Sequence, residues 1–359
     1  MNMNESKKST PKQWIAVAAL VGVNALWGLS FPIMKSLNLS MEQFFHLENG
    51  SVPSLLSVAY TSGMIGLRFV VSLAILCVAC PRLVRGANIA EWKAGALVGL
   101  FFYFGLVLQV IGLATIPASR SGFLTNLTAV FTPIFSAVLF RKPISFNVVI
   151  GVVMALVGVS ILTGLFHVDN GRFEVAPDAF SKWTHGDTLT TLGAVLFTGQ
   201  LLLVDHYGNK INSTAITPGM FLTVTLASGL TFAMLHAISL RDVPFHSGHP
   251  LPAWRMLFLN PVFIGIVSFL ALFCSVLAFL GMNKFQPHIS AEQASIVYSS
   301  EPVFASIGAL FLPSLLGRFQ SNLGYPNELV SLPLLLGGIC VLLANVVALW
   351  PRRNHVDKA

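Results

Sequence analysis

Two ionisable side chains, Arg68 and Glu301, interrupt long apolar stretches of the sequence near the middle of each stretch. A charged group is costly in hydrocarbon, so each is interpreted first as part of a functional site. Glu301 is suited to bind and release a proton, whereas Arg68 keeps its charge and could clamp an anion or a carboxylate. Two structural alternatives stay open: a hydrogen bond from Glu301 to a neighbouring helix, and a buried pair between the two side chains.

Aromatic and amide side chains occur at similar depth in other apolar stretches. A small-molecule pocket needs apolar walls with a few polar groups, so these side chains are candidates to line one. Lys35 is a further candidate at the end of its stretch, although its long stem could instead carry the ammonium group to the membrane interface. The aromatic and amide candidates are Trp27, Tyr103, Asn126 and Tyr298, with Gln109 and Gln200 as weaker ones.

Hydroxyl side chains form a stripe along one apolar stretch. Thr125, Thr128, Thr132 and Ser136 follow one another at spacings of three and four, which places them on one face of a helix. Small hydroxyl residues let helices approach closely, so helix contact is favoured over substrate binding along this face. Thr132 is nevertheless kept as a binding candidate.

Three prolines, Pro32, Pro133 and Pro302, stand inside apolar stretches. Each removes a backbone hydrogen bond and permits a kink if the stretch is helical. They are therefore candidates for hinges, with a static kink as an equally favoured alternative.

Metal or cofactor chemistry has little support in the sequence. His246 and His249 form an HxxH pattern, but it lacks a clear helix or carboxylate partner, so no metal ligand set is expected. The four cysteines lie in or at the edge of apolar stretches, which argues against a disulfide framework and against a zinc site. No cofactor is expected.

The composition shows what kind of element must position these residues. Of 359 residues, 55% are hydrophobic and 10% are charged, and the mean hydropathy is +0.76. A soluble domain has about 25% charged residues, so an integral, all-α membrane protein is expected. Ten apolar runs are long enough to cross a bilayer: Trp14–Met34, Pro53–Val78, Ala94–Ala114, Ser121–Phe140, Val148–Phe166, Thr188–Val204, Thr214–Ala237, Leu257–Gly281, Ala291–Leu312 and Leu332–Trp350.

The basic residues predict the orientation of these ten spans. With the N-terminus inside, thirteen lysines and arginines fall on the inner face and seven on the outer face. Cytoplasmic loops carry the excess of such residues, so both termini are expected in the cytoplasm. The expected location of the protein is the inner membrane of the cell. The net charge of +7 does not indicate nucleic-acid binding, because the basic residues form short clusters between apolar runs.

The chain also contains a weak internal repeat. A shift of 169 residues places Ser121 on Ser290 and Pro133 on Pro302, and other matches follow in the same order. Five helices per copy is an odd number, so two copies in tandem have opposite orientations, as in the inverted repeats of secondary transporters. The expected organisation is a tail (1–13), a first repeat (14–166), an outer loop (167–187), a second repeat (188–350) and a tail (351–359).

Three short motifs resemble those of EamA-type permeases in the drug/metabolite transporter superfamily. Trp27–Lys35 (WGLSFPIMK) resembles their first-helix motif, Leu67–Phe69 (LRF) their second-helix motif and Glu301–Ala305 (EPVFA) their ninth-helix motif. The likeness covers about residues 14–350. One departure is an extra outer loop around Pro313–Val330 in the second copy.

The resemblance implies a secondary transporter, a permease or exporter that moves a small organic metabolite or drug-like molecule by alternating access. Its partners would be that substrate and the lipid bilayer, with a homodimer left open. No P-loop occurs to supply an ATP-driven step. The alternatives are a passive channel or a membrane partner subunit. An intramembrane enzyme is less favoured, because neither paired membrane aspartates nor a serine with a partnering histidine is found.

Overall fold

The computed structural model describes most of the chain, and all structural statements concern those residues. They are 11–44, 55–140, 146–162, 166–169, 172–175, 183–208, 210–239, 260–289, 294, 297–319 and 324–349. The predicted HxxH pair, His246 and His249, lies outside them, as do the tail 351–359 and most of the tail 1–13.

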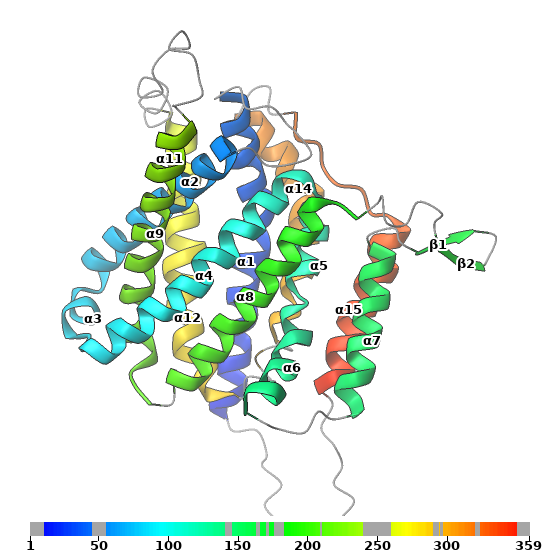
Figure 1. The fold of residues 1–359 in the computed structure, drawn as a ribbon, viewed down its shortest axis with the longest axis horizontal. Helices are drawn as coiled ribbons and strands as arrows, with labels where there is room; N and C mark the ends of the chain where they lie inside the picture. The colour runs from blue at the N-terminus through cyan, green and yellow to red at the C-terminus, as the bar shows by residue number, and fades with distance from the viewer. Residues whose placement is uncertain are drawn as a thin grey trace, which may run out of the picture.

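The described chain is almost entirely helical (Figure 1). Its α-helices are α1 (Pro11–Phe44), α2 (Leu55–Ala79), α3 (Pro81–Gly86), α4 (Ile89–Thr115), α5 (Ala118–Thr125), α6 (Thr128–Phe140), α7 (Phe146–Leu162), α8 (His185–Gly208), α9 (Ile216–Ser239), α11 (Pro261–Ala271), α12 (Ala278–Phe285), α14 (Glu301–Phe319) and α15 (Leu332–Leu349). Shorter turns are η2 (Ser213–Ala215), η3 (Leu272–Leu277), which is a π-helix, and η4 (Gln286–His288).

A small antiparallel hairpin interrupts the helical pattern. It consists of β1 (Phe166–Asp169) and β2 (Arg172–Val175), and it pairs Phe166 with Val175. The sequence predicted a span that reaches Phe166, but α7 ends at Leu162 and the following residues form the hairpin. The hairpin therefore begins one residue before the predicted outer loop 167–187 and lies mostly within it.

Eight helical segments in the described part are long and apolar enough to cross a membrane. Two further apolar helices, at Val149–Gly158 and Leu332–Ala344, are shorter than the other eight. The helical membrane fold is therefore confirmed, whereas the count of ten crossings remains a prediction for these two. The eight segments are Trp14–Met41, Ser57–Ala79, Ile89–Thr115, Ala118–Leu139, His185–Gly208, Ser213–Ile238, Pro261–His288 and Glu301–Phe319.

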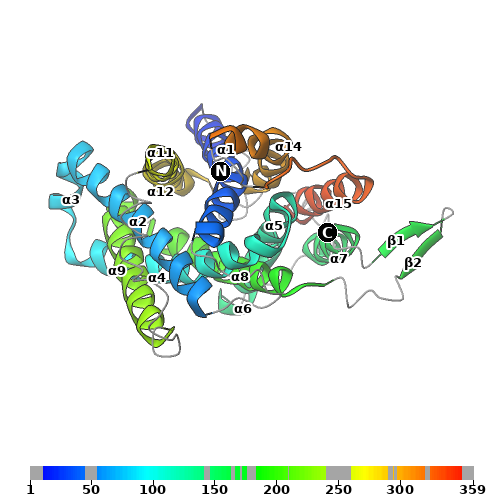
Figure 2. The ribbon, with the colours of Figure 1, turned by 90° about the horizontal axis from the view of Figure 1, so that it is seen from above.

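The helices pack in pairs that join distant parts of the sequence. Helix α4 lies against α8 and α9, α2 against α9, α1 against α14, and α7 against α15. Seen from above, α7 and α15 stand at one side of the bundle, next to the hairpin (Figure 2). In Figure 1, α1 begins and α15 ends at the lower end of the bundle, so the opposite end is called the upper end below.

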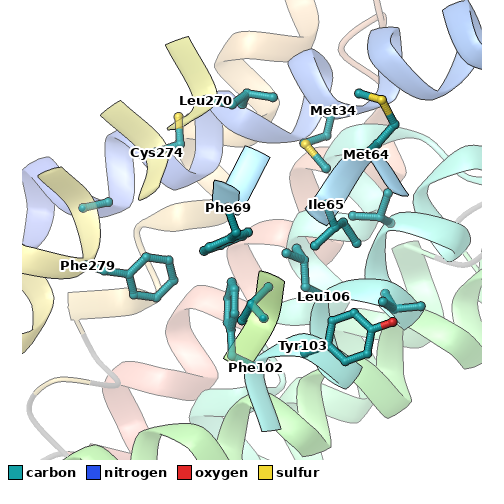
Figure 3. Packing of buried hydrophobic residues seen from close by; sticks show 14 of the residues in the cluster. Met34, Met64, Ile65, Phe69, Phe102, Tyr103, Leu106, Leu270, Cys274 and Phe279 are labelled. Atoms are coloured by element: carbon teal, nitrogen blue, oxygen red, sulfur yellow. The ribbon is translucent and has the colours of Figure 1, made fainter. Parts of the chain in front are cut away.

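An aromatic cluster holds four of these helices together. Phe69 of α2, Phe102 of α4, Phe221 of α9 and Phe279 of α12 place their ring centroids 4.9 to 5.9 Å apart in four edge-to-face pairs. Figure 3 shows Phe69, Phe102 and Phe279 converging between the helices. Each such pair contributes about 0.5–1.5 kcal/mol beyond its buried area. The cluster thus fixes the centre of the bundle beside the cavity described below.

Several helices are interrupted near the middle of the bundle. A turn at Asn126 and Leu127 separates α5 from α6, and a second turn at Ser299 and Ser300 precedes α14. The first interruption lies well before Pro133, which is inside α6. Pro302 stands in the first turn of α14, where its missing N–H has no helical partner to lose. Pro302 was predicted inside a helix, and this placement corrects that expectation.

Candidate functional site

A central cavity lies where these interruptions meet the middle of α1, α2, α4 and α8. It encloses about 840 Å³ free of protein atoms, including the part that opens to solvent. Its walls are mostly apolar, with one cationic, one acidic and several amide or hydroxyl side chains. They are Trp27, Ser30, Phe31, Arg68, Phe102, Leu106, Gln109, Thr125, Asn126, Thr128, Ala129, Phe197, Gln200, Leu201, Phe279, Met282, Tyr298 and Glu301.

Arg68 is buried in this wall and is anchored by the neighbouring π-helix. Its Nε donates to Ser275 Oγ at 2.8 Å, and Nη2 donates to the Cys274 carbonyl at 3.0 Å. A π-helix widens the turn and leaves backbone carbonyls available to outside donors. Helix η3 thus supplies the acceptor that a regular α-helix would have used internally. The guanidinium is held at one edge, and Arg68 still lines the cavity.

Arg68 has no carboxylate partner within 4.0 Å among the described residues. The single ion pair found in that part of the chain joins Arg120 to Asp187 at 2.6 Å. The buried pair between Arg68 and Glu301, one of the alternatives open from the sequence, is therefore not formed in this structure. Both side chains face the same cavity without being bonded to each other.

Glu301 stands at the first position of α14 and is partly exposed to the cavity. No hydrogen bond to its carboxylate is found within the described ranges. A close contact between α1 and α14 sets its position, because a Cβ added to Gly28 would lie 2.6 Å from the Glu301 carbonyl oxygen and from Phe304 Cβ. Only glycine permits this approach.

Aromatic side chains form the wall between these two charged groups. The Trp27 indole donates to the Cys274 carbonyl at 3.2 Å, so the same freed carbonyl fixes Trp27 and Arg68. The Trp27 ring lies 5.3 Å from that of Phe279 and 6.0 Å from that of Tyr298. The Tyr298 hydroxyl donates to Gln286 Oε1 at 2.8 Å. The ring faces are thus fixed apolar surfaces.

The interrupted helix α5–α6 supplies the amide side of the cavity. Gln109 Nε2 donates to Thr125 Oγ1 at 2.8 Å. Asn126, at the turn itself, is buried, and its Nδ2 has no hydrogen-bond partner among the described residues. A buried donor without a partner is costly, and a bound ligand would satisfy it. Asn126 is therefore a polar contact that the cavity offers to an occupant.

Five of the eight predicted binding residues line the cavity, and three do not. Lys35 donates to the Ile116 carbonyl near the upper end. Tyr103 is buried and donates to Ser62 Oγ at 3.4 Å. Thr132 donates to the Thr128 carbonyl of its own helix at 2.6 Å. The binding role of the other five, Trp27, Arg68, Asn126, Tyr298 and Glu301, stays a prediction, as do the hinge roles of Pro32, Pro133 and Pro302.

Most of the residues that were not predicted are apolar. Phe102, Phe197 and Phe279 line the cavity, but phenylalanines such as Phe104 and Phe273 face outward from similar helices. Residue type alone does not separate the two groups. The cavity-lining phenylalanines could have been identified from the face of the helix on which each lies, relative to the faces that carry Arg68 and Glu301.

Apolar helices of membrane-spanning length around a cavity with mostly apolar walls and a few polar side chains define a multi-pass integral membrane protein. Residues 13–164 match the EamA-like transporter family. A protein of Archaeoglobus fulgidus named "Uncharacterized transporter" is 23% identical over 297 residues, which cover 82% of this chain and 77% of that protein. These matches confirm the resemblance of the chain to EamA-type permeases of the drug/metabolite transporter superfamily.

One solved structure, described only as "Crystal structure of protein", is 19% identical to the chain. The comparison covers 92% of this chain and 96% of that one, with a TM-score of 0.49.

Proposed function

We propose that the protein is a secondary transporter that carries a small organic metabolite or drug-like molecule through the central cavity by alternating access. The observation that carries the proposal is the presence of Arg68 and Glu301 in one cavity at the centre of the bundle, not bonded to each other. Charged groups at this depth are costly, and substrate or proton binding accounts for retaining both. In this proposal the protein resides in the inner membrane of the cell.

The helix contacts support two inverted repeats as the basis of alternating access. Helix α1 packs on α12 and α14, and α8, at the same place in the second half, packs on α4, α5 and α6. Helices α2 and α9 contact each other, as do α7 and α15. If each helix is replaced by its counterpart in the other half, the contacts of α1 become those of α8, and the contacts α2–α9 and α7–α15 become themselves. In such transporters the halves rock about a site near the midplane.

The two charged groups have separate roles in this proposal. Arg68 binds an anionic group of the substrate, because its Nε and Nη2 are anchored on η3, its Nη1 meets the weak acceptor Met34 Sδ at 3.6 Å, and the side chain lines the cavity. Glu301 binds a proton in one access state and releases it in the other. Its counterpart in the first repeat is Thr132, which cannot titrate, so only the second half would carry the proton.

Two experiments in sequence test the proposal. The substrate is first identified by comparing metabolites retained and released by a knockout and its parent strain. Proteoliposomes that hold the purified protein and unlabelled substrate are then given a trace of labelled substrate outside. A carrier accumulates the label by counterflow, a channel only equilibrates it, and an enzyme returns a chemically altered molecule. Simple equilibration of the label or chemical alteration of the substrate would contradict the proposal.

A further inference from the structure

Residues 324–331, the described part of the segment between α14 and α15, cross the upper end of the bundle (Figure 1). Residues 324–330 are called the strap here. It lies within the extra loop that the sequence predicted around Pro313–Val330; the first part of that stretch, up to Phe319, instead continues α14. Gly324 has a φ of +59°, a left-handed conformation that favours glycine, and it precedes the contacts described next.

The strap replaces backbone hydrogen bonds that Pro313 removes from α14. A proline inside a helix has no N–H and displaces the carbonyl four residues earlier, which is that of Ala309. The Glu328 N–H donates to this Ala309 carbonyl at 2.9 Å. Asn327 Oδ1 accepts from the Ser314 N–H at 2.9 Å, and its Nδ2 donates to Ser314 Oγ at 3.1 Å. The strap is thus fastened to α14 beside Pro313, where the helix lacks a backbone hydrogen bond.

The Glu328 side chain then fastens the strap to a second helix, α5. Its Oε1 accepts from the Ala118 N–H at 2.6 Å and from the Ser119 N–H at 3.4 Å, and its Oε2 accepts from the Ser119 hydroxyl. The N-cap position of α5 is Pro117, which provides no side-chain cap. A carboxylate from more than 200 residues away therefore caps α5 and accepts hydrogen bonds from first-turn N–H groups that have no partner within the helix.

Helix α5 connects this cap to the cavity. It also packs against α14, and its opposite end is Thr125, followed by Asn126 at the helix interruption; both line the cavity. Helix α1 joins the same cluster through Lys35, which bonds the Ile116 carbonyl just before α5 and lies 5.8 Å from the centre of the Tyr325 ring. Three elements that border the cavity are thus tied together above it.

We propose that the strap is a latch, in which Glu328 holds α5 against α14 and α1 while the upper path to the cavity is closed and releases α5 when that path opens. The latch rests on the alternating-access function proposed above. The Arg120–Asp187 pair ties α5 to α8 at the same end and stays in place in this proposal, so that the α5–α14 seam is the one that parts.

Cysteine labelling tests the latch without knowledge of the substrate. Ser30 lines the cavity, and Ser30→Cys provides a thiol of nearly the same size. Intact cells and inside-out vesicles are treated with a membrane-impermeant maleimide, and mass spectrometry quantifies labelling of the peptide that contains position 30. Glu328→Ala should raise the labelling rate from the upper side about tenfold, because a charged cap contributes about a factor of ten. Glu328→Gln, which keeps one acceptor oxygen, should lie between Glu328→Ala and the native residue.

Glu91 offers a matched control at the lower end. It caps α4 by accepting from the Asn88 N–H at 2.7 Å, so Glu91→Ala removes a carboxylate of the same kind from another helix N-terminus. Glu91→Ala should leave labelling from the upper side unchanged. If Glu91→Ala accelerates it as much as Glu328→Ala does, the effect is general loosening and the latch is wrong.

Labelling measured separately from the upper and the lower side distinguishes a failure of the latch from a failure of the transport function. A latch in an alternating-access carrier predicts that Glu328→Ala raises labelling from the upper side and lowers it from the lower side. If both rise, the strap closes a continuous pore and alternating access fails. If neither changes, the latch fails and the transport proposal is untouched. If Glu328→Ala does not insert into the membrane, Asn327→Ala is used instead. It removes the side-chain hydrogen bonds between the strap and Ser314 of α14, and the same labelling results are expected for it.

Discussion

Replacement of Arg68 by lysine separates a planar clamp from a simple positive charge. In the structure Nε and Nη2 donate to Ser275 Oγ at 2.8 Å and to the Cys274 carbonyl at 3.0 Å, and Nη1 meets the weak acceptor Met34 Sδ at 3.6 Å, while Arg68 lines the cavity. A lysine has one ammonium group, so it cannot keep this anchor and also present a fork of donors to an anion. Arg68→Lys should therefore retain the charge and lose at least one charged hydrogen bond to the substrate.

The expected magnitude follows from that single lost bond. A hydrogen bond to a charged group contributes about 1.5–3 kcal/mol, which corresponds to about ten- to 100-fold in affinity at about 1.4 kcal/mol per factor of ten. Arg68→Gln loses the charge too and should abolish measurable uptake at substrate concentrations that saturate the native protein. Ser275→Ala keeps the guanidinium but frees its Nε, so it should raise KM less than Arg68→Lys does.

The assay is initial-rate transport in proteoliposomes, with the amount of inserted protein measured for every variant. The substrate is the one identified by the metabolite comparison. The clamp predicts a rise in KM that follows the order Ser275→Ala, Arg68→Lys, Arg68→Gln. Native KM and Vmax for both Arg68 variants, at native levels of insertion, would refute the reasoning and leave Arg68 as a structural residue.

Two further predictions concern topology and helix contact. Reporter fusions at Gly171 and Gly248, which lie outside the described residues, should report the outside, and a fusion after Ala359 should report the inside; an external C-terminus would contradict the inverted repeat. Gly28→Ala should lower the melting temperature in detergent, because its Cβ meets the Glu301 carbonyl at 2.6 Å and overpacking costs about 1–3 kcal/mol. Gly22→Ala, in the same helix, meets nothing within 4 Å and should leave the melting temperature unchanged or raise it slightly, because alanine is favoured over glycine in a helix by about 1 kcal/mol.

The sequence predicted the elements of this fold better than their irregularities. Apolar length alone located the eight helical segments that are long enough to span a membrane, because every backbone group in lipid must be bonded within a helix. Neither the turn at Asn126 nor the π-helix around Cys274 has a proline or glycine to mark it. Such features arise from tertiary contacts, here the bonds from Arg68 and Trp27 to the Cys274 carbonyl. They could not be predicted from local residue preferences.

The candidate site followed the same pattern. Arg68 and Glu301 were predictable because charge is rare at membrane depth, and the structure brings both to one cavity. Lys35 and Tyr103 were not separable from them by type, since helical phase and neighbouring acceptors decide which polar side chain faces a cavity. Lys35 instead reaches the Ile116 carbonyl and joins the strap region. The functional meaning of the extra loop required the contacts of Glu328.

Glu301→Gln in proteoliposomes tests most directly the claim that this cavity is the site of coupled transport. Glutamine keeps the shape and the hydrogen-bonding capacity of the side chain but cannot titrate. The same vesicles are assayed for net uptake driven by a pH gradient and for exchange of labelled against unlabelled substrate without a gradient. The account predicts that net uptake collapses while exchange continues, because exchange needs no net proton movement. Net uptake with an unchanged dependence on pH would contradict it, and Glu301 would then be a structural residue.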